Sequence, residues 1–107
     1  MGLTKADLFT PEQNELAQIA KAFAHPARIA IVEHLLKANQ CINSNLVEEL
    51  GLAQATISQH LKELKSVGII IGTIEGTSMS YCINPAMWKK VEDRFGGLLN
   101  RYDPNCC

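Results

Sequence analysis

Apolar residues in the middle of the chain follow two successive periods. Between Gly51 and Gly68 they recur every three to four residues, a spacing that gathers them on one face of an α-helix. These residues are Ile57, Leu61 and Leu64. After Gly68 the period falls to two, as in β-strands, with a glycine-containing turn at residues 75–77. We therefore predict a helix followed by a β-hairpin whose strands span residues 69–74 and 78–83.

Three further helices are predicted from residues typical of helix starts, in each case with a proline in the first turn. They span about residues 11–23, 26–38 and 85–102. Thr10 and Gln13 can form a capping box at the start of the first helix. Gly96 and Gly97 weaken the last one, so we expect a bend or a frayed turn there.

A short segment before the central helix completes a helix-turn-helix. Within it, Asn45 and Glu48 can form another capping box, which predicts a short helix. Two short helices joined at a glycine and followed by a hairpin make a winged helix-turn-helix. The predicted fold is mostly α with a small β-hairpin, in one domain over residues 1–107 with flexible ends at about 1–9 and 103–107.

The outward face of the central helix has small, hydroxyl and amide side chains where a solvated face would have mainly Glu and Lys. Such side chains offer donors and acceptors to base edges in the DNA major groove, although an ordinary polar surface is the alternative. For His60, at the border of the buried arc, we favour a packed role with one hydrogen bond over a base contact. With the wing tip included, the candidate DNA-binding residues are Gln54, Thr56, Ser58, Gln59, Lys62, Lys65, Thr77 and Ser78.

Charge and composition argue against several classes of protein. The 107 residues have a formal net charge of −1, which argues against a protein that coats nucleic acid without regard to sequence. The sequence has no apolar run of membrane-spanning length and no signal-peptide core, so we expect a cytoplasmic protein. It also lacks a recognisable nucleophile–base arrangement or phosphate-binding loop, and we do not expect an enzyme.

The first and last helices have more apolar residues than a small three-helix core can cover. We therefore expect a homodimer through these two helices. A twofold dimer would place its two reading helices in successive major grooves of double-stranded operator DNA. The residues assigned to the dimer contact are Leu16, Ile19, Phe23, Trp88, Val91 and Phe95.

Two segments resemble the ArsR/SmtB family of winged-helix repressors. They are HPARIAIVEHL, residues 25–35, and LVEELGLAQATISQHLKELKSVGII, residues 46–70. That family typically has a proline–arginine helix start and a core of the form GLSQxxxSxHLxxLxxxGL. The resemblance implies a homodimer that binds operator DNA, and in many members a metal ion, metalloid or thiol-modifying signal releases the DNA.

Two departures from the family concern the DNA-binding part. Ala53 stands where the family often has a serine cap, which costs roughly 1 kcal/mol of helix stability. The wing tip lacks the usual Arg or Lys, so phosphate contacts must come from Lys62, Lys65, Arg28 or Lys37. With few cations available, we expect a shallow dependence of DNA affinity on salt.

The third departure concerns the sensor. We expect the four cysteines to be thiols, because a reducing compartment disfavours disulfides. Cys41 stands where arsenic-responsive members have the first cysteine of a Cys-x-Cys pair, but Asn43 takes the second place. The last helix has no histidine and so lacks the site of zinc-responsive members. Cys106 and Cys107 could bind zinc or another soft metal together, and arsenite would need Cys41 as a third thiolate; the alternative is an idle tail. We interpret Cys82 as a small buried residue.

The leading hypothesis is a dimeric transcriptional repressor that a thiol-directed signal releases from operator DNA, the signal being arsenite, another soft metal or an oxidant. One alternative is a DNA-binding regulator of the same fold without metal sensing. The other is a winged helix whose exposed helix binds a protein.

Overall fold

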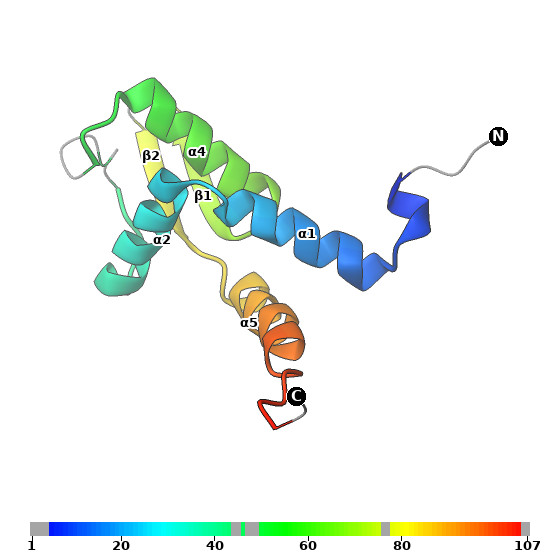
Figure 1. Ribbon diagram of the computed structural model, residues 1–107. Helices are drawn as coiled ribbons and strands as arrows, with labels where there is room; N and C mark the ends of the chain where they lie inside the picture. Colours follow the sequence, from blue (N-terminus) through cyan, green and yellow to red (C-terminus); the bar gives the residue numbers. More distant parts are fainter. Residues whose placement is uncertain (1–4, 44–45, 47–49, 76–77, 106–107) are drawn as a thin grey trace.

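The computed structural model describes residues 5–43, 46, 50–75 and 78–105, and the predicted winged helix-turn-helix architecture is confirmed (Figure 1). In the described part, four α-helices accompany a two-stranded antiparallel sheet. In chain order the elements are the 3-10 helix η1 (Lys5–Leu8), α1 (Pro11–Phe23), α2 (Pro26–Ala38), α4 (Gln54–Ser66), β1 (Ile70–Glu75), β2 (Ser78–Ile83) and α5 (Pro85–Leu99). None of the helices described is long and apolar enough to cross a membrane.

The predicted helix starts of α1 and α2 are confirmed at the level of single hydrogen bonds. The hydroxyl oxygen of Thr10 accepts from the backbone N–H of Gln13, whose side chain accepts from the N–H of Thr10 in return. His25 caps α2, because its Nδ1 accepts from the N–H of Ala27 at 3.1 Å. In contrast, α4 begins after Ala53 with no side-chain cap, as its sequence predicts.

Two predictions about helix bounds have different outcomes. The last helix, α5, continues through Gly96 and Gly97 and ends at Leu99, two residues beyond them, so the predicted end near residue 102 is wrong and Tyr102 lies beyond the helix. The short helix predicted before α4, with its Asn45–Glu48 capping box, falls mainly on residues 44–45 and 47–49, which lie outside the described residues.

The wing is a regular hairpin to which a third segment is attached. Register runs from Ile70 opposite Ile83 to Glu75 opposite Ser78. Ile42, which follows α2, pairs with Tyr81 through two backbone hydrogen bonds of 2.8 and 2.9 Å. This segment is therefore bound to the edge of β2.

The core lies where α1, α2 and α4 meet the hairpin, and α4 packs along β1 (Figure 1). Each of these elements contributes at least one completely buried apolar side chain, and the periodic residues of α4 are among them. The largest fully buried residues are Tyr81, Ile19, Ile31, Leu35, Leu46, Ile57, Leu61, Leu64, Ile69 and Ile70. This packing fixes which face of α4 remains exposed.

Ion pairs join α1 to α5. The Glu15 carboxylate of α1 lies 2.7 Å from Lys90 Nζ and accepts from Arg94 Nε at 2.6 Å. Hydrogen bonds from Lys90 and Arg94 hold the pKa of Glu15 below its ordinary value, because they stabilise the ionised carboxylate. The two helices are thus joined within one chain.

Several residues assigned to the dimer contact pack against one another within the chain. The ring of Phe23 meets those of Trp88 and Phe95 edge-on, with centroids 6.3 and 6.5 Å apart. Ile19 and Val91 are only 1% and 6% exposed, so they belong to the core and the dimer assignment is corrected for both. Periodicity identified these stripes but could not tell an intramolecular partner from an intermolecular one.

A single residue connects the wing to α5. The backbone N–H of Asn84 donates to the carbonyl oxygen of Ile69 at 2.9 Å, next to the last pair of the hairpin. The Asn84 side chain also accepts from the N–H of Met87 and so caps α5. Asn84 therefore holds the start of α5 directly against the end of the hairpin.

Candidate nucleic-acid interface

The helix α4 exposes a polar face opposite the side that packs on the hairpin. Ile57, Leu61 and Leu64 are buried, whereas Thr56, Gln59, Lys62 and Lys65 are exposed and Gln54 and Ser58 are half-buried. The six candidates on this helix therefore all lie at least partly at the surface. Of the two wing candidates, Thr77 lies outside the described residues and Ser78 begins β2.

A neighbouring carboxylate orients the central amide of this face. Gln59 Nε2 donates to the Glu63 carboxylate at 3.3 Å, one helical turn away. Ser66 in turn donates its hydroxyl to the backbone oxygen of Glu63 at 2.7 Å. Since Glu63 accepts one amide hydrogen of Gln59, the carbonyl oxygen and the second hydrogen remain for another partner.

A hollow of about 550 Å³ lies between α4 and the wing. It is lined by Lys62 and Lys65 of the helix and by Thr73 and Ile74 of β1. Two ammonium groups beside a hydroxyl suit the phosphate oxygens of a DNA backbone. Thr73 is not among the residues predicted for the wing, which lie only at its tip; its exposure next to the buried Ile74 follows the alternation of a strand and is a signal present in the sequence.

Arg28, a candidate phosphate contact, is instead engaged inside the protein. Its Nε donates to His60 Nδ1 at 3.2 Å, and its Nη1 donates to the carbonyl oxygens of Lys21 and Ala22 at 3.4 and 3.3 Å. The guanidinium thereby links the end of α1 to α2 and α4. These contacts occupy Nε and Nη1 of Arg28, and Lys62, Lys65 and Lys37 are candidates without such contacts to the rest of the fold among the hydrogen bonds described.

His60 is a packed residue with one hydrogen bond, as we favoured from the sequence. It is 8% exposed, and its ring lies 4.3 Å from that of His25. Burial, with the nearby charges of His25 and Arg28, lowers the pKa of His60 below its ordinary value of 6.5. A neutral ring is what the Arg28 contact requires, because Nδ1 must accept.

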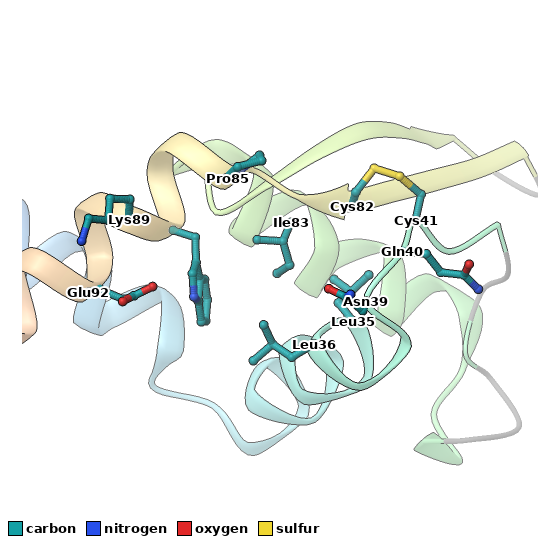
Figure 2. A pocket seen from close by; sticks show the side chains of 11 residues that line it. Leu35, Leu36, Asn39, Gln40, Cys41, Cys82, Ile83, Pro85, Lys89 and Glu92 are labelled. Carbon is teal, nitrogen blue, oxygen red and sulfur yellow. A yellow bond between two sulfur atoms is a disulfide. The ribbon is translucent and has the colours of Figure 1, made fainter.

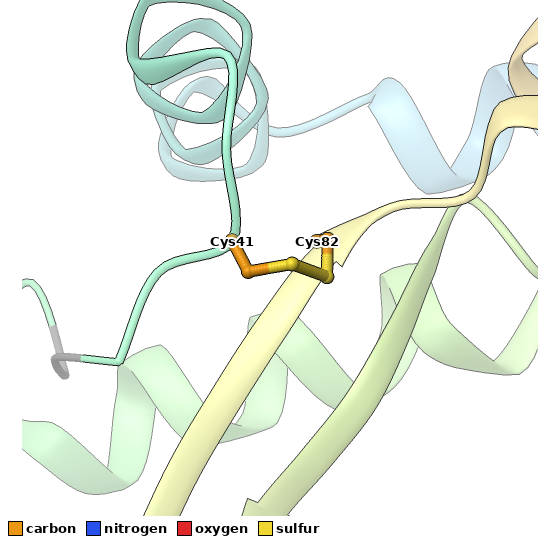
Figure 3. Close-up of a disulfide and its surroundings, with 2 residues drawn as sticks. All are labelled: Cys41 and Cys82. Carbon is orange, nitrogen blue, oxygen red and sulfur yellow. A yellow bond between two sulfur atoms is a disulfide. The ribbon is translucent and has the colours of Figure 1, made fainter.

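The cysteines differ most from expectation. Cys41, after α2, and Cys82, in β2, form a disulfide across 41 residues of sequence (Figure 3). The expectations of free thiols and of Cys82 as a simple buried residue are therefore wrong for this pair. Cys41 has no thiolate to offer a metal while the bond persists, and Cys106 and Cys107 lie outside the described residues. Within the described residues, no three His, Cys, Asp or Glu side chains are grouped to hold a metal ion.

Comparison with known proteins gives one consistent result. Residues 25–71 match the family model described as bacterial regulatory protein, arsR family. The chain is 39% identical over 64 residues to the HTH-type transcriptional repressor SmtB of Mycobacterium tuberculosis, a match that covers 60% of this chain and 47% of that protein. The chain thus spans about half the length of that repressor.

Other similarities extend over more of the chain. The uncharacterized HTH-type transcriptional regulator MJ1325 of Methanocaldococcus jannaschii is 34% identical over 87 residues, which is 81% of this chain and 90% of that one. The fold is also similar to an ArsR-like transcriptional regulator from Rhodococcus sp. RHA1, with a TM-score of 0.62, 25% identity and coverage of 86% and 89%. The crystal structure of M. tuberculosis Rv0081 aligns with a TM-score of 0.60, 28% identity and coverage of 86% and 93%.

Proposed function

Because the chain belongs to the ArsR family of helix-turn-helix transcriptional regulators, we propose that it is a dimeric repressor that binds operator DNA through α4 and the wing. The observation that supports this best is the exposed amide and hydroxyl face of α4, next to the hollow lined by Lys62, Lys65 and Thr73. Base-reading groups on a helix beside phosphate-binding cations are what major-groove recognition needs.

The proposal includes control through cysteine thiols. The Cys41–Cys82 bond and the Ile42–Tyr81 hydrogen bonds tie the segment before α4 to the wing strand β2. Breaking the bond removes one of these ties and alters how firmly α4 and the wing are held relative to each other. A soft-metal site at Cys41, Cys106 and Cys107 belongs to this proposal only for the reduced chain, since arsenite and similar ions bind thiolates.

DNA recognition is tested with duplexes enriched from a random library and measured by fluorescence anisotropy. We expect Gln59→Ala and Lys62→Ala each to weaken binding, Gln59→Ala on the order of tenfold or more because an amide contact to a base edge is lost. The matched control is Lys89→Ala, an exposed lysine that lies on α5 and not on this face. Unchanged binding in both α4 variants would favour the protein-binding alternative.

Thiol control is tested on the same duplex with oxidised and reduced protein. We expect the dissociation constant to differ between the two forms, and the difference to vanish in the Cys41→Ser/Cys82→Ser variant. Equal DNA affinity of the oxidised and reduced proteins would contradict thiol control and support the alternative of a DNA-binding regulator without thiol sensing.

A further inference from the structure

A cavity of about 410 Å³ lies between α2, β2 and α5, away from the exposed face of α4. Its walls are mainly apolar and include Leu35 and Leu36 of α2, Ile83 of β2 and Trp88 of α5. The volume falls within the range of small-molecule sites, which are usually apolar with a few polar groups. Leu36 is 46% exposed, so part of this apolar wall is open to solvent.

The two ends of the cavity differ in chemistry. Cys41 and Cys82, which the disulfide joins, lie at one end of the lining, and Lys89 and Glu92 of α5 lie at the other, with Leu36 and Ile83 between them (Figure 2). A molecule with an apolar body that lies between these ends would place one terminus next to the two bonded cysteines. Its polar terminus would remain among charged, solvent-exposed side chains.

We propose that this cavity binds a low-molecular-weight thiol with an apolar body and positions it for exchange with the Cys41–Cys82 disulfide. The choice of a thiol follows from the wall itself, since a disulfide joins two of the lining residues and disulfides exchange with thiolates. The apolar walls select the body of that thiol, because burying it removes apolar surface from water.

The exchange balances without any further reagent. The ligand thiolate attacks one of the two Sγ atoms, and a new S–S bond joins the ligand to that cysteine. The Cys41–Cys82 bond breaks, and the other cysteine leaves as a thiolate that takes up a proton from water. One disulfide replaces another, so no external oxidant or reductant is consumed.

The regulatory meaning of this site rests on the proposed function, whereas the binding and exchange steps do not. Formation of the mixed disulfide would release Cys41 from β2. Among the described residues, the Ile42–Tyr81 backbone hydrogen bonds would still hold the stretch after α2 against β2. The ligand would thereby change the restraint on the wing that we propose to affect DNA affinity.

The test compares two probes, phenylmethanethiol and 2-mercaptoethanol, whose thiols are similarly basic but whose bodies are apolar and polar. Exchange is followed on the oxidised protein, without DNA, by intact-mass detection of the mixed disulfide. We expect the rate with phenylmethanethiol to saturate with concentration and the rate with 2-mercaptoethanol to rise linearly. Linear kinetics for both probes would overturn the proposal.

Two variants give a matched comparison. Leu36→Gln makes the cavity wall polar, and we expect the preference for the apolar thiol to fall by about fivefold. Ile71→Gln is the control, because Ile71 is 45% exposed, lies opposite Cys82 in the hairpin and does not line the cavity. Equal effects of the two variants would contradict a bound thiol.

A second copy of the chain could cover the same cavity, and the experiment separates this case. If the preference for phenylmethanethiol disappears as protein concentration is raised through dimerisation, the partner fills the cavity and the proposal fails. If exchange is selective but DNA affinity is the same for free and mixed-disulfide protein, the thiol site stands and only the proposed thiol control of DNA binding fails.

Discussion

At the scale of single residues, His60 shows how one side chain joins the reading helix to the helices behind it. It accepts a hydrogen bond from Arg28, which also donates to carbonyl oxygens at the end of α1. The ring lies against His25, the cap of α2. The orientation of α4 therefore depends on a buried ring that must be neutral to accept this bond.

This contact makes stability depend on pH. Because the folded-state pKa of His60 lies below the ordinary 6.5, the unfolded chain takes up this proton more readily. The contribution of His60 is complete above about pH 6.5 and is lost as pH falls through the folded pKa. We expect urea unfolding between pH 8 and pH 5 to show this loss, and His60→Gln to flatten it. If the free energy of unfolding of His60→Gln falls as steeply with pH as that of the wild type, the effect comes from another residue. His34→Gln, at a half-buried residue, is the control.

Gly72 is required by the close approach of the two wing strands. Its φ is +131°, and an added Cβ would meet the backbone oxygen of Ser80. We expect Gly72→Ala to lower the free energy of unfolding by roughly 1–3 kcal/mol. The matched control is Gly97→Ala in α5, where no atom lies within 4 Å, and it should stabilise the helix by roughly 0.5–1 kcal/mol. Urea unfolding of both variants measures the difference, and equal effects would refute the steric argument.

At the scale of elements, the disulfide encloses α4 and nearly the whole hairpin within one covalent loop. A closed loop restricts the unfolded chain more than the folded one, so it stabilises the fold. For a separation of 41 residues, we expect Cys82→Ser to lower the free energy of unfolding of the oxidised protein by roughly 2–4 kcal/mol. Wild-type protein unfolded in excess reductant should match the variant. If reduction leaves the unfolding curve unchanged, the bond does not stabilise this fold.

The elements themselves were predictable, whereas the contacts between distant segments were not. The starts of α1 and α2 depend on local signals, a capping residue and a following proline, and both helices have the predicted bounds. The pairing of Cys41 with Cys82 and of Ile42 with Tyr81 joins segments with no local signature of their neighbourhood. The disulfide, and any thiol chemistry that depends on it, could therefore be identified only from the three-dimensional structure.

The same limit explains the mixed result at the candidate interface. The exposed face of α4 followed from its 3.6-residue period, so its six polar candidates were placed at the surface. Arg28 could not be assigned in this way, because only the fold shows that its guanidinium faces His60 and the end of α1. Charge alone did not show which cations are free to meet phosphate.

At the scale of the whole molecule, the ends of the chain expose apolar surface. Leu98, Leu99 and Tyr102 lie exposed at the C-terminal end, and Leu8 and Phe9 precede α1. Such side chains favour contact with another surface when they are contiguous. We propose them, rather than the core residues Ile19 and Val91, as the place to look for the dimer contact.

The distribution of cations sets the salt dependence of DNA binding. With Arg28 engaged internally, we expect on the order of two to four phosphates neutralised per monomer. For a dimer, log Kd against log salt should then have a slope of between roughly 4 and 7 in magnitude. Lys62→Ala should reduce it by about 1 per monomer. A much steeper slope in anisotropy titrations would show that other cations contact the DNA.

Asn84 is hydrogen-bonded both to the wing and to the first turn of α5, and this has a mechanical consequence. Because its backbone is bonded to Ile69 while its side chain caps α5, we expect a twist of the wing to turn the start of α5 with it. Torque applied to the wing by a bent duplex would reach the C-terminal end of the molecule, where two copies of the chain would meet if the exposed apolar side chains there form the dimer contact.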